Sequence, residues 1–396
     1  MKRFGLVISL FAVFAIAFEG TCRIEDRIRY GMPIFSPMRQ EEDLVVRDRL
    51  GMHGRPNAQY EQFALNSLGM RGPEVSVAKP ARTLRVVTVG ASETFGLYET
   101  AGREYPRQLE DSLRAVIAGA CAAGSIQRVE VLNAALFGMA IPTSIQDLRL
   151  RVAPTHPDVV VAYPPSPTYL QDELPRAAPP DSGAPRAGSS WKRLLYPRAL
   201  GRVRDQVKAL LPLRVANWIR GRDARQRLRR HPPGWRFTSV PQDRLAAYDA
   251  DLRALVGTIR AIGAIPMLAT HGNAFPPGMP PNEGLLHTWE QFYPRATGTT
   301  IVAFDSAARL VTLRVARDSG VVVVDAQTLL HDRIARDHVP LFADYAHFNN
   351  AGATVMAGAV ARAMNELLAS RGALACAPHT TIAARSRAGA PDGGTP

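Results

Sequence analysis

Three residue types that together can activate a hydroxyl group for nucleophilic attack occur at opposite ends of the chain. Ser92 follows an apolar run, and Asp344 and His347 stand three residues apart near the C-terminus. A serine hydroxyl is a poor nucleophile unless a base removes its proton, and an imidazole base needs a third group that fixes its tautomer and stabilises its charged form. If the fold brings these residues together, they can transfer an acyl group through a covalent intermediate.

The elements that must position these residues are apolar, β-branched runs that alternate with helical patterns. Runs that are apolar throughout are typical of parallel strands buried on both faces. The predicted strands are residues 84–90, 128–133, 158–163, 264–270 and 321–325. The predicted helices are residues 104–118, 144–151, 242–262, 299–318 and 351–369. This alternation predicts an α/β fold with an open, doubly wound parallel sheet.

Ligands bind at the carboxyl ends of the strands in such a sheet. Ser92 lies in the turn after the first strand, where backbone N–H groups are placed to receive an oxyanion. Asp344 and His347 come after the fifth strand, so all three residues are expected at one edge. The other polar candidates at this edge are Asn133, Ser166, Thr168 and His271. Asn133 is also interpreted as a structural residue whose side-chain amide holds the second loop in place by hydrogen bonds. His271 is also interpreted as a hydrogen-bonded histidine at a strand end.

Two short motifs and one loop resemble a known family. Gly90-x-Ser92-x-Thr94 and Asp344-x-x-His347 are similar to the first and last blocks of SGNH (GDSL-type) hydrolases, and residues 133–138 resemble the second block. Residues 66–72 resemble a hairpin that precedes the core in exported bacterial members. Arg71, in this segment, is interpreted as a turn residue or as a ligand for a substrate anion.

The resemblance implies a flavodoxin-like three-layer α/β/α sandwich with a five-stranded parallel sheet, and ester hydrolysis with no metal or cofactor. Ser92 would be the nucleophile of a catalytic triad, His347 the general base and then acid, and Asp344 its orienting partner. The backbone N–H groups of Ser92 and Gly138 would donate to the oxyanion. The expected substrate is an ester, with O-acetyl or O-acyl groups on a cell-surface glycan as one class.

The sequence departs from the family at two positions. Ala91 stands where the family usually has aspartate, and the third block, Gly-x-Asn-Asp, is absent because the third strand runs into residues 163–169 without an asparagine. Losing one oxyanion donor typically costs about 10²–10³ in rate. Ser166, Thr168 and His271 are equal candidates to replace it. Two alternatives therefore stay open: a catalytically impaired glycan-binding or polysaccharide-assembly protein, and an O-acyltransferase with the same triad.

The net charge of +13 comes from one segment, residues 186–236, which contains 15 Lys and Arg against two acidic residues. The rest of the chain is balanced, so we predict no nucleic-acid binding. The segment lies in an insertion over residues 164–241 that carries apolar residues at helical spacing, which predicts a basic helical cap. This cap would pack on the core, lie on an anionic membrane surface, or bind an acidic polysaccharide.

The N-terminus has the pattern of an export signal. Lys2 and Arg3 precede an uncharged run over residues 4–18, which predicts a signal peptide (residues 1–20) or a single anchor, with the body periplasmic or on the extracytoplasmic face of the membrane. Residues 30–80 are expected to form an N-terminal extension, 82–375 the hydrolase domain and 377–396 a disordered tail. Cys121 and Cys376 are expected either to form a disulfide or to be two unrelated thiols.

Overall fold

A five-stranded parallel sheet forms the centre of the computed structural model, which describes residues 2–30, 34–35, 41–119, 126–177 and 228–371 and single positions between 199 and 226. The strand order is β6-β5-β7-β8-β9. Every residue of the central strands β5 and β7 is buried. β7 is apolar throughout, whereas β5 also contains two threonines and Arg85, whose buried guanidinium pairs with Glu130 of β6. The strands are β5 (Thr83–Gly90), β6 (Arg128–Asn133), β7 (Val159–Tyr163), β8 (Ile265–Ala269) and β9 (Val322–Val324).

Helices cover both faces of the sheet, so the predicted three-layer α/β/α sandwich is confirmed. One apolar core lies between the sheet and α4 (Ile141–Asp147), α8 (Gln242–Ala261) and α10 (Gly298–Ser319). The other lies between the sheet and α3 (Tyr105–Gly119), α11 (Ala326–Asp337) and α12 (Asn350–Ser370). A further helix, α9 (Glu283–Phe292), packs against α10.

Helix α11 was not predicted. Only four of its twelve residues are buried, and two of these, Gln327 and His331, are polar. The apolar stripe that marks an amphipathic helix is therefore too sparse to be recognised. The longer helices have clear boundary signals: the Thr297 side chain caps α10, and Gly320 ends it with a positive φ of 60°.

The N-terminal extension forms two antiparallel hairpins. A 3₁₀ turn (Glu41–Leu44) leads into them, and their small apolar cluster includes Phe95, which lies in the turn after β5. The hairpins therefore pack directly against the segment that carries Ser92. Their strands are β1 (Val45–Asp48) with β2 (Gly51–Gly54), and β3 (Gln59–Tyr60) with β4 (Phe63–Ala64).

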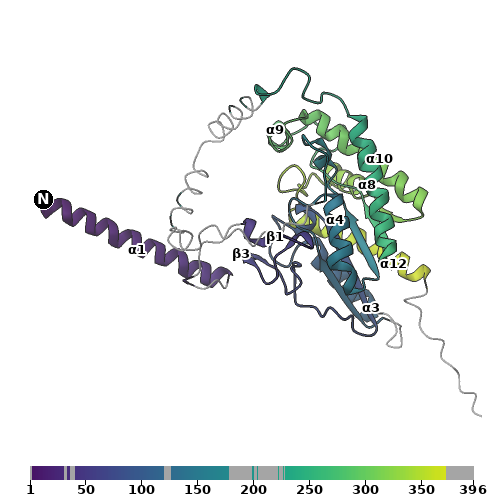
Figure 1. Cartoon of the computed structure of the whole chain (residues 1–396), viewed down its shortest axis with the longest axis horizontal. Helices are drawn as coiled ribbons and strands as arrows, with labels where there is room; N and C mark the ends of the chain where they lie inside the picture. Colours follow the sequence, from purple (N-terminus) through teal and green to yellow (C-terminus); the bar gives the residue numbers. More distant parts are fainter. Residues whose placement is uncertain are drawn as a thin grey trace, which may run out of the picture.

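The first helix, α1 (Lys2–Tyr30), extends away from the sheet (Figure 1). Within it, residues Leu6–Arg29 are long and apolar enough to cross a membrane, and almost none of this stretch is buried. The helix continues beyond the apolar run at residues 4–18. Its length and position at the N-terminus fit a signal peptide or an anchor.

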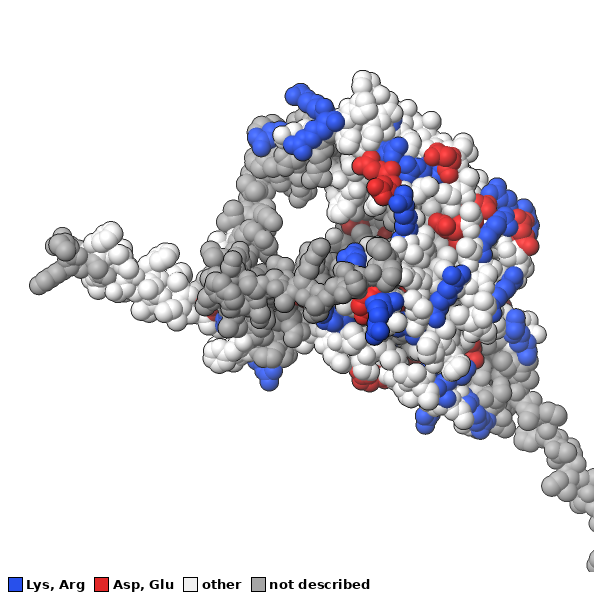
Figure 2. Space-filling view, in the orientation of Figure 1, with Lys and Arg blue, Asp and Glu red and all other residues white. Residues whose placement is uncertain are grey.

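Several sequence predictions lie outside the described residues. These are the disulfide between Cys121 and Cys376, the tail at 377–396, and most of the basic segment at 186–236. On the face shown in Figure 2, the described Lys and Arg side chains are interspersed with Asp and Glu. Arg253 of α8, for example, pairs with Asp318 of α10.

Candidate active site

The turn that carries Ser92 depends on a glycine at the end of β5. A Cβ on Gly90 would collide with the Thr94 side chain and lie only 2.7 Å from the carbonyl oxygen of Tyr163 on β7. Without that Cβ, the strand turns directly into α2 (Ser92–Phe95), a single helical turn. Ser92 therefore stands at the carboxyl edge of the sheet, at the first position of the turn.

The structure brings Ser92, His347 and Asp344 together in hydrogen-bonding order. Ser92 Oγ lies 2.8 Å from His347 Nε2, although the two residues are 255 positions apart. His347 Nδ1 lies 2.8 Å from Asp344 Oδ2 and 3.0 Å from Oδ1. Asp344 Oδ1 also accepts hydrogen bonds from the backbone N–H groups of Ala346 and His347. These bonds hold the carboxylate in the turn before α12.

The electrostatics of this trio suit a histidine base. Burial disfavours the imidazolium, but the hydrogen bond with Asp344 and the charges of Glu93 and Asp344 outweigh burial and raise the pKa of His347. Burial likewise opposes the Asp344 carboxylate, but its hydrogen bonds, first of all that with His347, lower its pKa. Asp344 therefore accepts a hydrogen bond from Nδ1–H of neutral His347, and Nε2 is left to accept the Ser92 hydroxyl proton.

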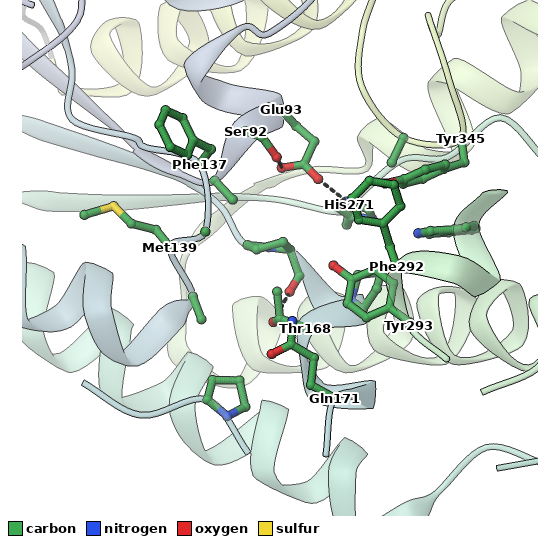
Figure 3. Close-up of a pocket in the computed structure, with 18 of the residues that line it drawn as sticks. Ser92, Glu93, Phe137, Met139, Thr168, Gln171, His271, Phe292, Tyr293 and Tyr345 are labelled. Carbon is green, nitrogen blue, oxygen red and sulfur yellow. Dashed lines mark hydrogen bonds and ion pairs between the residues drawn. The ribbon is translucent and has the colours of Figure 1, made fainter. Parts of the chain in front are cut away.

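A pocket of about 970 Å³ opens over the three residues (Figure 3). Of the other sequence candidates, Gly138, Thr168 and His271 line it, whereas Asn133 and Ser166 do not. Gly138 has a φ of 77°, in the left-handed region that favours glycine. It belongs to the loop after β6, and its backbone faces the same pocket as Ser92.

Asn133 supports the Ser92 turn from behind instead of contacting the pocket. Its amide donates to the carbonyl oxygens of Thr94 at 2.9 Å and Phe95 at 3.4 Å. Its Oδ1 accepts the backbone N–H of Ala135 at 3.2 Å. One side chain thus ties the first loop to the second, as expected for a structural asparagine. The structure does not place it as a substrate ligand.

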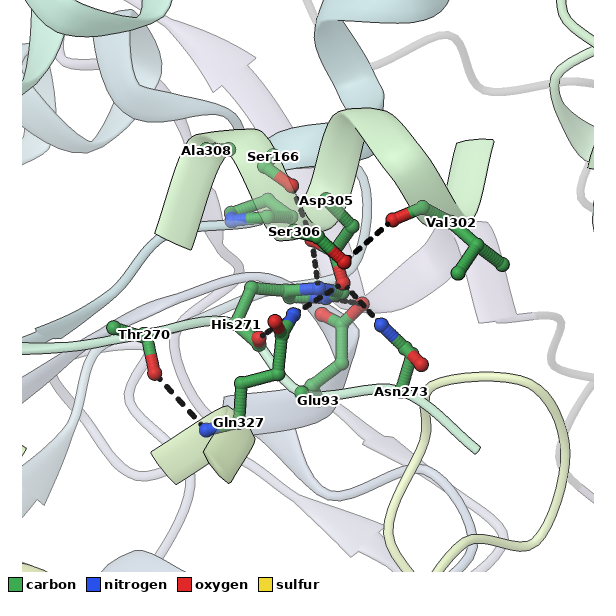
Figure 4. A network of polar contacts seen from close by, with 12 residues as sticks. Glu93, Ser166, Thr270, His271, Asn273, Val302, Asp305, Ser306, Ala308 and Gln327 are labelled. Atoms are coloured by element: carbon green, nitrogen blue, oxygen red, sulfur yellow. Dashed lines mark hydrogen bonds and ion pairs between the residues drawn. The ribbon is translucent and has the colours of Figure 1, made fainter. Parts of the chain in front are cut away.

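A buried polar network that the sequence analysis missed lies beside Ser92 (Figure 4). At its centre is Asp305 of α10, which is fully buried. His271 Nδ1 lies 2.8 Å from Asp305, and its Nε2 lies 3.5 Å from Glu93. Asp305 also accepts hydrogen bonds from Ser166, Asn273 and Gln327.

This network holds a second carboxylate next to the Ser92 hydroxyl. Glu93 Oε2 lies 3.4 Å from Ser92 Oγ. Burial opposes the charge on Glu93, but the hydrogen bond with His271 and the neighbouring histidines lower its pKa. Burial also opposes the charge on His271, but Asp305 and Glu93 raise its pKa. The available sequence signals were Glu93 itself, directly after Ser92, and an acidic residue in the apolar pattern of α10.

Arg71 does not have the surface or ligand role considered from the sequence. It is 4% exposed, and its guanidinium lies over the rings of Phe63 and Phe95, at 4.9 and 5.0 Å from their centroids. It donates to the carbonyl oxygens of Phe95, at 2.6 Å, and Gly96. Arg71 is not among the residues lining the pocket, so it acts as a support of the Ser92 turn.

Comparison with family models and with curated proteins finds no match for the sequence. Among solved structures, the acetylxylan esterase Axe2 from Geobacillus stearothermophilus is similar at 15% identity and a TM-score of 0.40, covering 73% of this chain and 96% of that one. A lipase/acylhydrolase from Enterococcus faecalis is similar at 14% identity and a TM-score of 0.39, covering 72% of this chain and 96% of that one. A putative lipolytic protein of the G-D-S-L family from Desulfitobacterium hafniense is similar at 15% identity and a TM-score of 0.36, covering 71% of this chain and 99% of that one. These are distant similarities of overall fold.

Proposed function

We propose that this protein is an SGNH-type serine hydrolase that cleaves esters through an acyl-enzyme on Ser92. The observation that carries the proposal is the unbroken hydrogen-bond chain from Ser92 Oγ through His347 to Asp344, at the floor of a large pocket. The chain has the geometry that activates a serine, and it lies at the sheet edge where α/β folds bind ligands.

The geometry supports the following reaction. His347 Nε2 takes the proton of Ser92 as Oγ attacks the ester carbonyl carbon. The resulting oxyanion accepts hydrogen bonds from the backbone N–H groups of Ser92 and Gly138. The tetrahedral intermediate then collapses, the bond to the alcohol oxygen breaks, and the His347 imidazolium protonates the departing alcohol. Water repeats these steps on the acyl-enzyme and releases the acid. If a sugar hydroxyl attacks in place of water, the same residues transfer the acyl group.

The lining of the pocket favours an acylated glycan as the substrate. Two aromatic side chains of the lining, Tyr98 and Phe292, are 56% and 65% exposed. Exposed rings of this kind cover the apolar face of a sugar, and the amide group of Gln171 in the same lining suits its hydroxyls. The apolar helix α1 would direct this activity to the periplasm or the outer face of the membrane.

A fluorophosphonate probe, which reacts with activated serines, tests the proposal on the full-length protein in mild detergent. We expect the wild type to be labelled and Ser92→Ala to be unlabelled. Ser112→Ala is the matched control, because Ser112 lies on α3 and bonds only within that helix. Acetylated glycans should compete with the probe and release acetate.

The opposite result is equally informative. A folded wild-type protein that the probe does not label would overturn the hydrolase proposal and favour the glycan-binding or assembly alternative. Mass spectrometry of the products, with and without an added sugar acceptor, would separate hydrolysis from acyl transfer.

A further inference from the structure

The missing asparagine of the third block leaves one donor position at the oxyanion to be explained, and this inference rests on the proposed function. The loop after β7, where that asparagine would stand, contains Ser166 and Thr168 in a short 3₁₀ segment (Ser166–Leu170). His271, after β8, is the third candidate from the sequence. Their hydrogen bonds decide which of them has a donor to offer.

All three candidates already use their donors inside the protein. The Ser166 hydroxyl donates to the buried carboxylate of Asp305. The Thr168 hydroxyl donates to the carbonyl oxygen of Pro165 at 2.8 Å. The two ring nitrogens of His271 face Asp305 and Glu93. Ser166 and His271 each pair with a buried carboxylate, and turning their donors towards the oxyanion would leave Asp305 or Glu93 buried with one partner fewer.

Tyr293 has a hydroxyl group that faces the same pocket and forms no hydrogen bond with the described residues. It follows α9 directly and lines the pocket together with Ser92. Figure 3 shows its hydroxyl oxygen pointing into the pocket between Thr168 and Glu93. Within the part of the chain that the structure describes, no group forms a hydrogen bond with this hydroxyl.

The surroundings of Tyr293 hold the backbone of its segment and keep its hydroxyl protonated. The segment after it is pinned by backbone hydrogen bonds, from Phe237 N to Arg295 O at 2.6 Å and from Thr297 N to Phe237 O at 3.2 Å. Burial, reinforced by the charges of Glu93 and Asp305, raises the pKa of Tyr293. The phenol therefore remains an O–H donor throughout the pH range in which a histidine base works.

We propose that the Tyr293 hydroxyl donates the third hydrogen bond to the oxyanion, in place of the absent asparagine amide. The donor thus comes from the segment after α9 and not from the loop after β7. Ser166 and His271 instead fix the polar network behind the pocket, and Tyr293 is a catalytic residue because its hydroxyl contacts the reacting oxygen.

The test compares Tyr293→Phe, which removes only the hydroxyl, with Tyr248→Phe as the matched control. Tyr248 is a buried core tyrosine whose hydroxyl pairs with Thr312, outside the pocket. We expect Tyr293→Phe to lower kcat by about 10²–10³ with little change in KM. Binding of a trifluoromethyl ketone, which forms a tetrahedral adduct with the serine, should weaken by the same factor. Tyr248→Phe should keep wild-type kcat and inhibitor affinity.

The outcomes separate this inference from the proposed function. If Tyr293→Phe retains wild-type kcat and ketone affinity while Ser92→Ala is inactive, the hydrolase proposal stands and the role of Tyr293 is overturned. If KM rises and kcat is unchanged, Tyr293 binds the ground state and the transition state equally and does not selectively stabilise the oxyanion, which also overturns it. A wild-type protein that neither reacts with the probe nor cleaves esters would overturn both.

Discussion

The guanidinium of Arg71 donates a hydrogen bond to the carbonyl oxygen of Phe95 at 2.6 Å. This contact joins the N-terminal hairpins to the single helical turn that begins at Ser92. The last carbonyl groups of a helix have no partner within it, and here a buried cation satisfies them. The N-terminal extension is thus part of the structure that positions Ser92.

Replacing Arg71 should therefore affect both stability and activity. Arg71→Met would take this donor from the Gly96 carbonyl and leave the Phe95 carbonyl with the 3.4 Å contact from Asn133. It would also remove the cation next to Glu104, whose carboxylate lies 3.6 Å away. We expect a loss of about 3–5 kcal/mol in the free energy of unfolding, measured by urea denaturation, and a lower kcat in the protein that remains folded. Arg71→Lys keeps the positive charge, so its free energy of unfolding should fall by less. Wild-type values for Arg71→Met would contradict the supporting role.

The activity should depend on pH through His347. This residue must be neutral to accept the Ser92 proton, and its pKa is raised by Asp344 and Glu93 against the effect of burial. The value of kcat/KM should thus fall as the pH decreases, with a midpoint above the usual histidine value of about 6.5. In Asp344→Asn the tautomer is no longer held, and kcat should drop on the order of 10⁴. A pH–rate profile without this acidic limb would argue against a histidine base.

Glu93 should set the position of that acidic limb. Glu93→Gln removes a negative charge that stabilises the His347 imidazolium, so the pKa of His347 should fall. Neutral His347 would then persist to lower pH, and the acidic limb of kcat/KM should shift downwards. Glu74→Gln, in the N-terminal hairpin where Glu74 bonds to Ser67, is the control and should leave the limb in place. An unshifted limb in Glu93→Gln would show that the two groups are not coupled.

Glu99 should reduce stability at alkaline pH. Burial raises its pKa to about 7, and its Oε1 is buried without a hydrogen-bond partner among the described residues. Since the folded state holds this proton more tightly than the unfolded state, stability should be lost as the pH rises from about 4.5 through 7. Glu99→Gln removes this loss, so its Tm should exceed that of the wild type at pH 8, and the difference should shrink towards pH 5. Equal Tm values at pH 8 would refute the prediction.

Much of the fold and the triad followed from local sequence features. Strands buried on both faces are mostly apolar, so β7 is visible as an unbroken apolar run and β5 as a run interrupted by Arg85 and two threonines. The turn that joins Asp344 to His347 is only three residues long, and their hydrogen bond forms within it. The rule that strand ends meet at one edge then predicted that Ser92 would join them.

The tertiary structure alone decided which groups surround this triad. Arg71 reaches the Ser92 turn, Asp305 accepts hydrogen bonds from three segments, and Tyr293 turns its hydroxyl into the pocket. None of these contacts has a local signature, because a buried polar group is stabilised by whichever partner the folded chain brings within hydrogen-bonding distance. The partners here stand from 22 to 139 positions apart along the chain, so residue types and spacing do not identify them.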